Sequence, residues 1–277
     1  MARHHDAAQD AGPMTVLHVG CTSERPPGPG YQRKLDFVEL SVRTPLPRKG
    51  TLARMRKELP ETLTIALVAP RAAVSSARGA LRPDAALDEA VTWTLDAHDI
   101  LRARMLVVPT PADLTTGARD RELLAEYVTR LGARSGRTIV WAPGGLWEPD
   151  VAARFAAKIG VVCAFDPLTS PPPAGSIVYA RLQALGGRQR FSEALLERVL
   201  VAVLREQIAE AFISIESPQS FREAIALRAL AATLAGADAA DAADDGDATD
   251  DDDADDDDAD DDDADDADDD DDGDDDE

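Results

Sequence analysis

The sequence is poor in cysteine, histidine and aromatic residues, and each shortage excludes a class of site. Two cysteines, Cys21 and Cys163, cannot form a disulfide framework. Four histidines supply no plausible zinc set, and no GxSxG, HExxH or Walker motif is present, so we expect neither a metal nor a cofactor. Aromatic residues make up 4% of the chain and do not alternate with basic ones, which argues against a nucleic-acid partner.

Long hydrophobic runs are also missing. No apolar stretch reaches the 18 or so residues that a membrane helix needs, and the opening MARHHDAAQDAGPM lacks the apolar segment of a secretory signal. We therefore expect a soluble, cytoplasmic protein without a membrane partner. Residues 1–13 are predicted to form a disordered arm.

Basic residues are absent from residues 238–277, which hold 28 acidic residues among Ala, Gly and one Thr. Of the chain's 53 acidic residues this leaves 25 for the body, against 29 Lys and Arg, so the body is slightly positive. Dense like charge with little apolar surface predicts a disordered, low-complexity tail. The simpler interpretation is that this tail keeps the protein in solution. The alternative is that it binds a basic partner or the barrel itself.

Eight short apolar runs bounded by Gly and Pro follow one another through the body, which predicts strands buried on both faces. Helical patterns separate most of them, so the strands are expected to be parallel and to close into a somewhat irregular (β/α)8 TIM-type barrel over residues 14–237. An open doubly wound sheet is the rival, but the first turn, VGCTSERPPGPG, lacks GxGxxG spacing. The runs cover residues 14–20, 37–42, 63–70, 105–111, 137–143, 160–167, 176–183 and 210–217.

Helices are predicted over residues 51–59, 86–103, 118–133, 151–159, 191–207 and 220–235. Two connections do not fit a helix. Residues 21–35 are rich in Gly and Pro, and the link between Asp166 and Ser176, with the sequence PLTSPPPAG, is too short for one.

Five segments in order resemble the YecE-like family, catalogued as domain of unknown function 72: VGCTSE, LDFVELSVRTPLP, ALVAPRAAVS, YARLQALG and FISIESPQSFREAIALRALA. The resemblance covers roughly residues 14–235 and implies a TIM-type barrel. It implies no reaction, because no activity is established for the family.

Departures from the family pattern indicate a divergent member with an eroded site. Ser41 stands where the family has Asn, Pro45 and Leu46 replace an aromatic pair, Val68 replaces a lysine and Gln183 replaces a histidine. Matching residues remain at four polar positions, Glu39, Arg71, Asp166 and Arg181.

Alternation along the strands turns several polar side chains toward the barrel axis. Glu39 points inward between Val38 and Leu40, and Arg181 and Glu216 point inward from the last two strands. A charge inside a barrel is costly unless it is paired, so Glu39 needs a partner. Arg181 is the first choice, because its guanidinium can meet a carboxylate through two hydrogen bonds, and Glu216 competes for it.

Three interpretations of this cluster stay open. It is either a structural ion-pair cluster, a pocket for a small polar or anionic ligand at the carboxyl mouth, or a catalytic site. The pocket would use Glu39, Arg71, Asp166, Arg181 and Glu216. A hydrolase- or isomerase-like enzyme would pair Glu39 with Asp166 or Glu216 as acid and base. We favour a ligand-binding or degenerate, non-catalytic barrel.

Other polar residues are weaker candidates. Cys21 follows the first strand and is expected to be exposed at the mouth, but no histidine is placed to activate it. His18, within the first strand, is expected to be a hydrogen-bonded core residue, and His98 is expected on the surface of a helix.

Overall fold

The computed structural model describes residues 15–132, 136–184, 190–205 and 207–244. The predicted arm over residues 1–13 and most of the predicted tail, residues 245–277, lie outside them. The chain divides into two units, Met1–Ala235 and Gly236–Glu277. The barrel lies in the first, and the last helix, α8 (Ser220–Asp244), runs past residue 237, where the barrel domain was expected to end.

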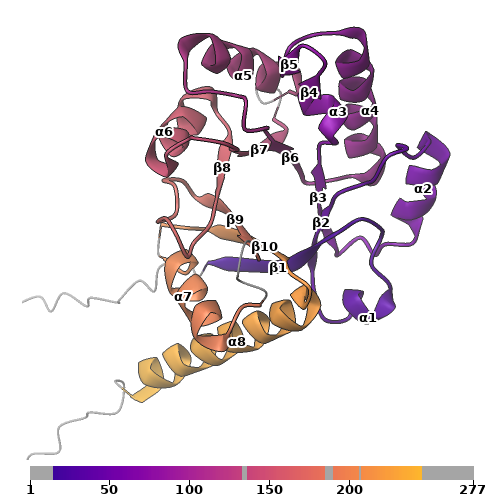
Figure 1. Cartoon of the computed structure of the whole chain (residues 1–277). Coiled ribbons are helices and arrows are strands. Elements are labelled where there is room, and N and C mark those ends of the chain that lie inside the picture. The colour runs from indigo at the N-terminus through magenta and orange to yellow at the C-terminus, as the bar shows by residue number, and fades with distance from the viewer. Residues whose placement is uncertain (1–14, 133–135, 185–189, 206, 245–277) are drawn as a thin grey trace, which may run out of the picture. The chain divides into compact units, whose positions relative to one another are not determined.

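Within the described residues, eight parallel strands close into a barrel, which confirms the predicted fold class and excludes the open sheet (Figure 1). Neighbouring strands follow chain order, and the last strand pairs with the first. One barrel strand lies at each of the eight predicted runs, and β1 extends three residues past its run: β1 (Val16–Ser23), β2 (Phe37–Leu40), β3 (Thr64–Val68), β6 (Met105–Pro109), β7 (Thr138–Ala142), β8 (Val162–Phe165), β9 (Ile177–Gln183) and β10 (Glu210–Glu216).

Helices surround the strands, and all six predicted helices are found close to their expected positions. Besides α8 they are α2 (Lys49–Lys57), α4 (Ala85–Leu101), α5 (Ala118–Arg130), α6 (Pro149–Ile159) and α7 (Glu193–Val203). Asp84 caps α4, because its carboxylate accepts a hydrogen bond of 2.8 Å from the Leu87 amide. No helix of the described residues combines the length and hydropathy needed to cross a membrane.

Three connections depart from a regular barrel. The first contains the single turn α1 (Pro29–Gln32). The crossover from β3 to β6 carries a short helix, α3 (Arg71–Val74), and a hairpin of β4 (Ser75–Ser76) and β5 (Gly79–Ala80), which the sequence pattern did not predict because each strand has only two residues. The link from β8 to β9 has no helix, as predicted.

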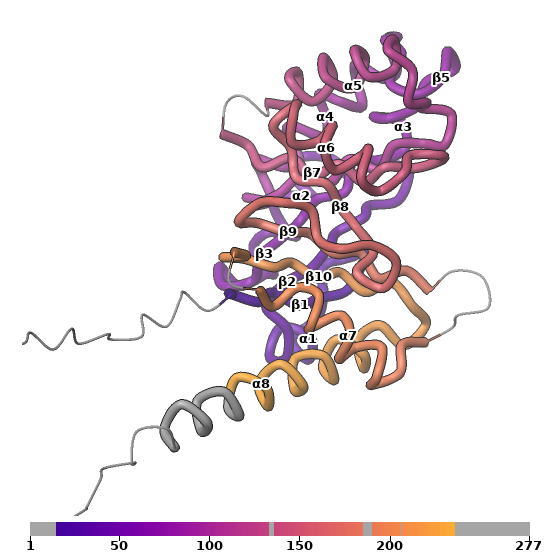
Figure 2. Tube along the Cα trace, turned by 90° about the vertical axis from the view of Figure 1, so that its left-hand side faces the viewer, coloured from indigo at the N-terminus to yellow at the C-terminus, as the bar shows by residue number. Residues whose placement is uncertain are grey.

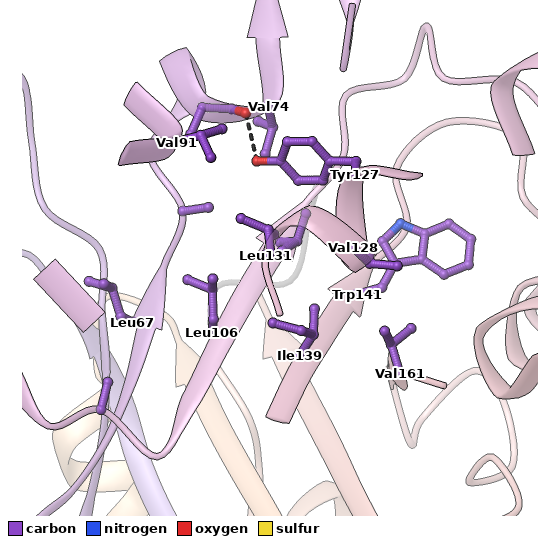
Figure 3. Packing of buried hydrophobic residues seen from close by; sticks show 14 of the residues in the cluster. Leu67, Val74, Val91, Leu106, Tyr127, Val128, Leu131, Ile139, Trp141 and Val161 are labelled. Atoms are coloured by element: carbon purple, nitrogen blue, oxygen red, sulfur yellow. Dashed lines mark hydrogen bonds between the residues drawn. The ribbon is translucent and has the colours of Figure 1, made fainter. Parts of the chain in front are cut away.

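Apolar residues form an inner and an outer core. Small and aromatic side chains such as Phe37, Ala66 and Phe212 fill the barrel. Outward-facing residues pack against α2, α4, α5 and α6 on one side and against α7 and α8 on the other (Figure 2). On the first side, Tyr127 of α5 donates a buried hydrogen bond of 2.6 Å to the Ala73 carbonyl, which ties α5 to α3 (Figure 3).

A close approach of β1 and β2 requires glycine at position 20. A Cβ atom there would lie 2.0 Å from the carbonyl oxygen of Phe37. The Tyr31 hydroxyl bridges the same two strands, accepting from the Cys21 amide at 2.8 Å and donating to the Phe37 carbonyl at 2.7 Å. These contacts hold β1 and β2 together immediately before the polar residues that they carry.

Candidate functional site

Glu39 lies inside the barrel near the carboxyl end of β2, and none of its surface is exposed. Leu40 packs outward against the helices, so alternation turns Glu39 inward, as predicted. Parallel pairing places Thr22 of β1 level with Glu39, and Ser214 of β10 level with Arg181 of β9. Side chains from four neighbouring strands therefore meet at one level of the barrel.

Four hydrogen bonds saturate the Glu39 carboxylate. Arg181 donates through Nε to Oε2 at 3.1 Å and through Nη2 to Oε1 at 2.9 Å. The Tyr179 hydroxyl donates to Oε2 at 2.7 Å, and the Thr22 hydroxyl donates to Oε1 at 3.0 Å. Thr22 is itself 3.1 Å from the Ser214 hydroxyl. The predicted pair of Glu39 and Arg181 is confirmed, with the two-point geometry expected of a guanidinium and a carboxylate.

Two of the three partners of Glu39, Tyr179 and Arg181, are held as donors. Burial, and then the negative charge of Glu39, raise the pKa of Tyr179 well above its ordinary value, so its hydroxyl keeps its proton. Burial by itself would lower the pKa of Arg181, but the adjacent Glu39 outweighs it and the pKa rises. Arg181 therefore remains a cation, and its rigid fork stays directed at the carboxylate.

These hydrogen bonds fit a stabilising role for Glu39 better than a role in proton transfer. A general base needs a lone pair within reach of the substrate, whereas both oxygens of Glu39 already accept two hydrogen bonds each. A buried ion pair adds little stability compared with apolar packing. The loss of one partner is costly, however, because it leaves the other charge buried and unpaired. Glu39 and Arg181 are thus a pair that the barrel needs intact.

Arg181 also reaches the rim of the barrel. Its side chain is 17% exposed, and Nη2 lies 3.9 Å from Oε2 of Glu216, which is half exposed at the end of β10. Gln183 of β9 donates to the same Glu216 oxygen at 2.7 Å. The predicted competition therefore resolves in favour of Glu39 as the direct partner, with Glu216 as a distant second.

Two of the predicted pocket residues are not brought to the pair. Asp166 follows β8 and is half-buried, and its carboxylate accepts the Leu168 amide at 2.9 Å in a local turn. Arg71 is exposed at the start of α3. In the described part of the chain, neither forms a hydrogen bond or ion pair with Glu39 or Arg181.

The minor candidates divide. The prediction that Cys21 is exposed was wrong: it is 4% exposed beneath Tyr31, and burial raises its pKa to about 11. His18 is hydrogen-bonded, as predicted, with Nδ1 2.8 Å from Asp36. The prediction for His98 was wrong, because the buried face of α4 is wide enough to include it at 9% exposure. Across the described ranges, no three His, Cys, Asp or Glu side chains are grouped to hold a metal.

Sequence reasoning missed two donors to Glu39 and one further buried acid. Tyr179 was not singled out, although it precedes Arg181 by two residues and therefore shares its inward face. Thr22 was missed because the first strand was expected to end at Gly20, whereas β1 continues to Ser23. Glu223 of α8 is 5% exposed and accepts hydrogen bonds from the Phe191 amide at 2.7 Å and from the Ser217 hydroxyl.

No protein-family model and no curated protein matches the sequence. Solved structures do match its fold. A DUF72 family protein from Enterococcus faecalis V583 aligns at 13% identity over 78% of this chain and 97% of its own, with a TM-score of 0.58. A DUF72 family protein from Thermotoga maritima MSB8 aligns at 11% identity over 78% and 99%, with a TM-score of 0.54.

The structure called SacUVDE aligns at 12% identity over 74% of this chain and 82% of its own, with a TM-score of 0.52. Identities this low establish the fold and nothing of the chemistry. The chain therefore has the fold of DUF72 proteins, which confirms at the level of the fold the resemblance seen in its motifs.

Proposed function

We propose that this chain is a divergent DUF72-type barrel that binds a small polar ligand at its carboxyl mouth and performs no acid–base chemistry with Glu39. One observation carries the proposal: the Glu39 carboxylate is fully buried and both of its oxygens are occupied by Arg181, Tyr179 and Thr22. A carboxylate in this state orients its arginine.

Arg181 is the residue through which a ligand would be held. Glu39 fixes Nε and Nη2, and among the described residues Nη1 has no hydrogen-bond partner. Gln183 and the exposed carboxylate of Glu216 stand beside it on the rim. A small molecule with an acceptor for the guanidinium and a donor for Glu216 fits this mixed-charge edge, and Arg71 and Asp166 are outer candidates for further contacts.

The enzymatic alternative, with Glu39 and Asp166 or Glu216 as acid and base, has less support. It requires Glu39 to give up a hydrogen bond in the buried pair, and it requires Asp166 to leave the turn in which it accepts the Leu168 amide. Glu216 is half exposed on the rim, and its carboxylate already accepts a hydrogen bond of 2.7 Å from Gln183.

A thermal-shift screen of the full chain tests the proposal, using sugars, polyols, amino acids and small carboxylic acids at millimolar concentrations. A ligand should raise the melting temperature of the wild type, and the rise should shrink in Gln183→Ala and Glu216→Gln, which leave the Glu39–Arg181 pair intact. Conversion of a hit to product, seen by NMR and abolished in Glu216→Gln, would instead establish the enzyme. Stabilisation that neither substitution affects would place the ligand elsewhere and contradict the proposal.

A further inference from the structure

The ring of helices around the barrel has a gap between α6 and α7. In a regular barrel a helix follows each strand and covers its outer face. After β8, residues 166–176 form no helix and include three consecutive prolines, Pro171–Pro173. The outer core divides at the same strand, because Cys163 of β8 packs with the α6 side and Phe165 with the α7 side.

Two adjoining cavities occupy this gap, and together we call them the α6 slot. One, of about 320 Å³, is bounded by Trp147 and Pro171–Pro173. The other, of about 390 Å³, is bounded by Ala157. Both are also bordered by Ala153 and Cys163, so they follow one another along α6. The slot runs along the outer face of β8, which lacks its usual helix, and Asp150 and Arg154 of α6 also border its first cavity.

A leucine is presented to solvent beside the slot. Leu146 is 94% exposed on the loop before α6. That loop is braced: Gly145 has a φ of +76°, and a Cβ on it would lie 2.5 Å from the Ala112 carbonyl oxygen. Next to it, Trp147 donates a buried hydrogen bond of 2.9 Å to the Leu114 carbonyl. Single exposed apolar residues are common, but this one lies on a braced loop next to Trp147, which borders the slot, so it is organised for a contact.

The exposed face of α6 carries one acidic and one basic residue, spaced so that the same face of a second copy is complementary to it. Asp150 and Arg154 lie one turn apart on either side of Ala153, and both side chains are exposed. Within the described ranges neither has an ion pair or hydrogen bond. If a second α6 runs antiparallel to the first, the two charges form two identical opposite-charge pairs, and the small Ala153 permits a close approach. A two-fold contact requires this reciprocity.

We propose that two copies of this chain associate through their α6 helices, antiparallel about a two-fold axis near Ala152, with Leu146 of each copy entering the slot of the other. With Asp150 opposite the partner's Arg154, Leu146 falls level with the partner's Lys158, at the end of the slot that Ala157 borders. One surface carries the protruding Leu146, a slot that can receive it, and the opposite charges of Asp150 and Arg154. A surface that is complementary to itself in this way favours a second copy of the chain over an unrelated helix. This inference does not rest on the proposed ligand.

Sedimentation velocity of the full chain tests the contact. The wild type should sediment at twice the chain mass of 29.5 kDa, and Leu146→Asp should sediment at 29.5 kDa. Val201→Asp is the matched control: Val201 is 72% exposed on α7, away from the slot, and its variant should remain dimeric. Arg154→Asp brings like charges together and should weaken the dimer at least ~10-fold. The exchange Asp150→Arg with Arg154→Asp should restore it.

Circular dichroism and melting temperature establish that each variant is folded. A wild-type chain that sediments as a monomer at about 100 µM would overturn the proposal, since a dimer this weak has no role. So would a dimeric Leu146→Asp variant, or a folded double exchange that fails to restore association. A trimer or larger assembly would contradict the two-fold arrangement.

Discussion

Replacement of Glu39 by glutamine tests whether its carboxylate holds the barrel together. The carboxylate accepts four hydrogen bonds from three side chains, all of them donors. A glutamine amide offers one oxygen and one NH2 group, so on one side a donor faces the donors of Arg181 or Tyr179. Arg181 also keeps its charge, and among the described residues Glu216, at 3.9 Å, is the remaining acidic neighbour.

The expected loss follows from the burial of the pair. Removing one partner of a buried ion pair costs about 3–5 kcal/mol. Because the Arg181 side chain is 17% exposed and keeps some contact with water, we expect a cost of about 3 kcal/mol. In a domain of this size each kcal/mol shifts the melting temperature by about 2–4 °C, so a fall of roughly 6–12 °C is expected.

Differential scanning calorimetry of the full chain measures the fall, with Glu216→Gln as the matched control. Glu216 is exposed and farther from Arg181, so its variant should stay within about 0.5 kcal/mol of the wild type. A Glu39→Gln protein that melts at the wild-type temperature would refute the structural role of the carboxylate. A large loss in the Glu216 control would show that the rim, and not the buried pair, carries the stability.

Three further outcomes are expected. Burial lowers the pKa of His98 below 6.5, so the folded state binds its proton less readily than the unfolded state does. The free energy of unfolding, measured by urea titration, should therefore fall as the pH drops below about 6.5, and His98→Gln should reduce that fall. Burial raises the pKa of Cys21 to about 11 and that of Cys163 to about 12, so both thiols should react with a disulfide reagent only after unfolding, and rapid native reaction would contradict the packing. Gly20→Ala sets a methyl group against the Phe37 carbonyl and should lower the melting temperature by more than about 5 °C, whereas an unchanged value would show that β1 and β2 separate freely.

The sequence was sufficient to predict the barrel and the direction of its inner side chains. Strand alternation has a period of two, so once LDFVELSV is identified as a strand with Val38 and Leu40 in the outer core, Glu39 must face inward. The same parity turns Arg181 inward. Parallel strands then set both residues near the carboxyl mouth, and the cost of a buried charge selects an arginine as partner.

What the sequence could not supply is distance. Asp166 and Arg71 lie at the carboxyl ends of their strands, as pocket residues should, but a local turn and an exposed helix end keep them from the pair. Tyr179 was missed because a hydrogen bond across the barrel depends on register, which pattern alone does not fix. Thr22 was missed because the first strand was expected to end at Gly20. The burial of Cys21 depends on Tyr31, ten residues away, lying over it.

A double-mutant cycle on Glu39→Gln and Arg181→Gln tests the central claim most directly, with the free energy of unfolding measured by urea denaturation of the full chain. If the two residues form one structural pair, each single substitution leaves the other residue without its partner. The double substitution removes both members and leaves neither unpaired. The double variant should then be at least about 2 kcal/mol more stable than the sum of the single losses predicts. Additivity within about 0.5 kcal/mol would show that Glu39 and Arg181 act independently and would contradict the account.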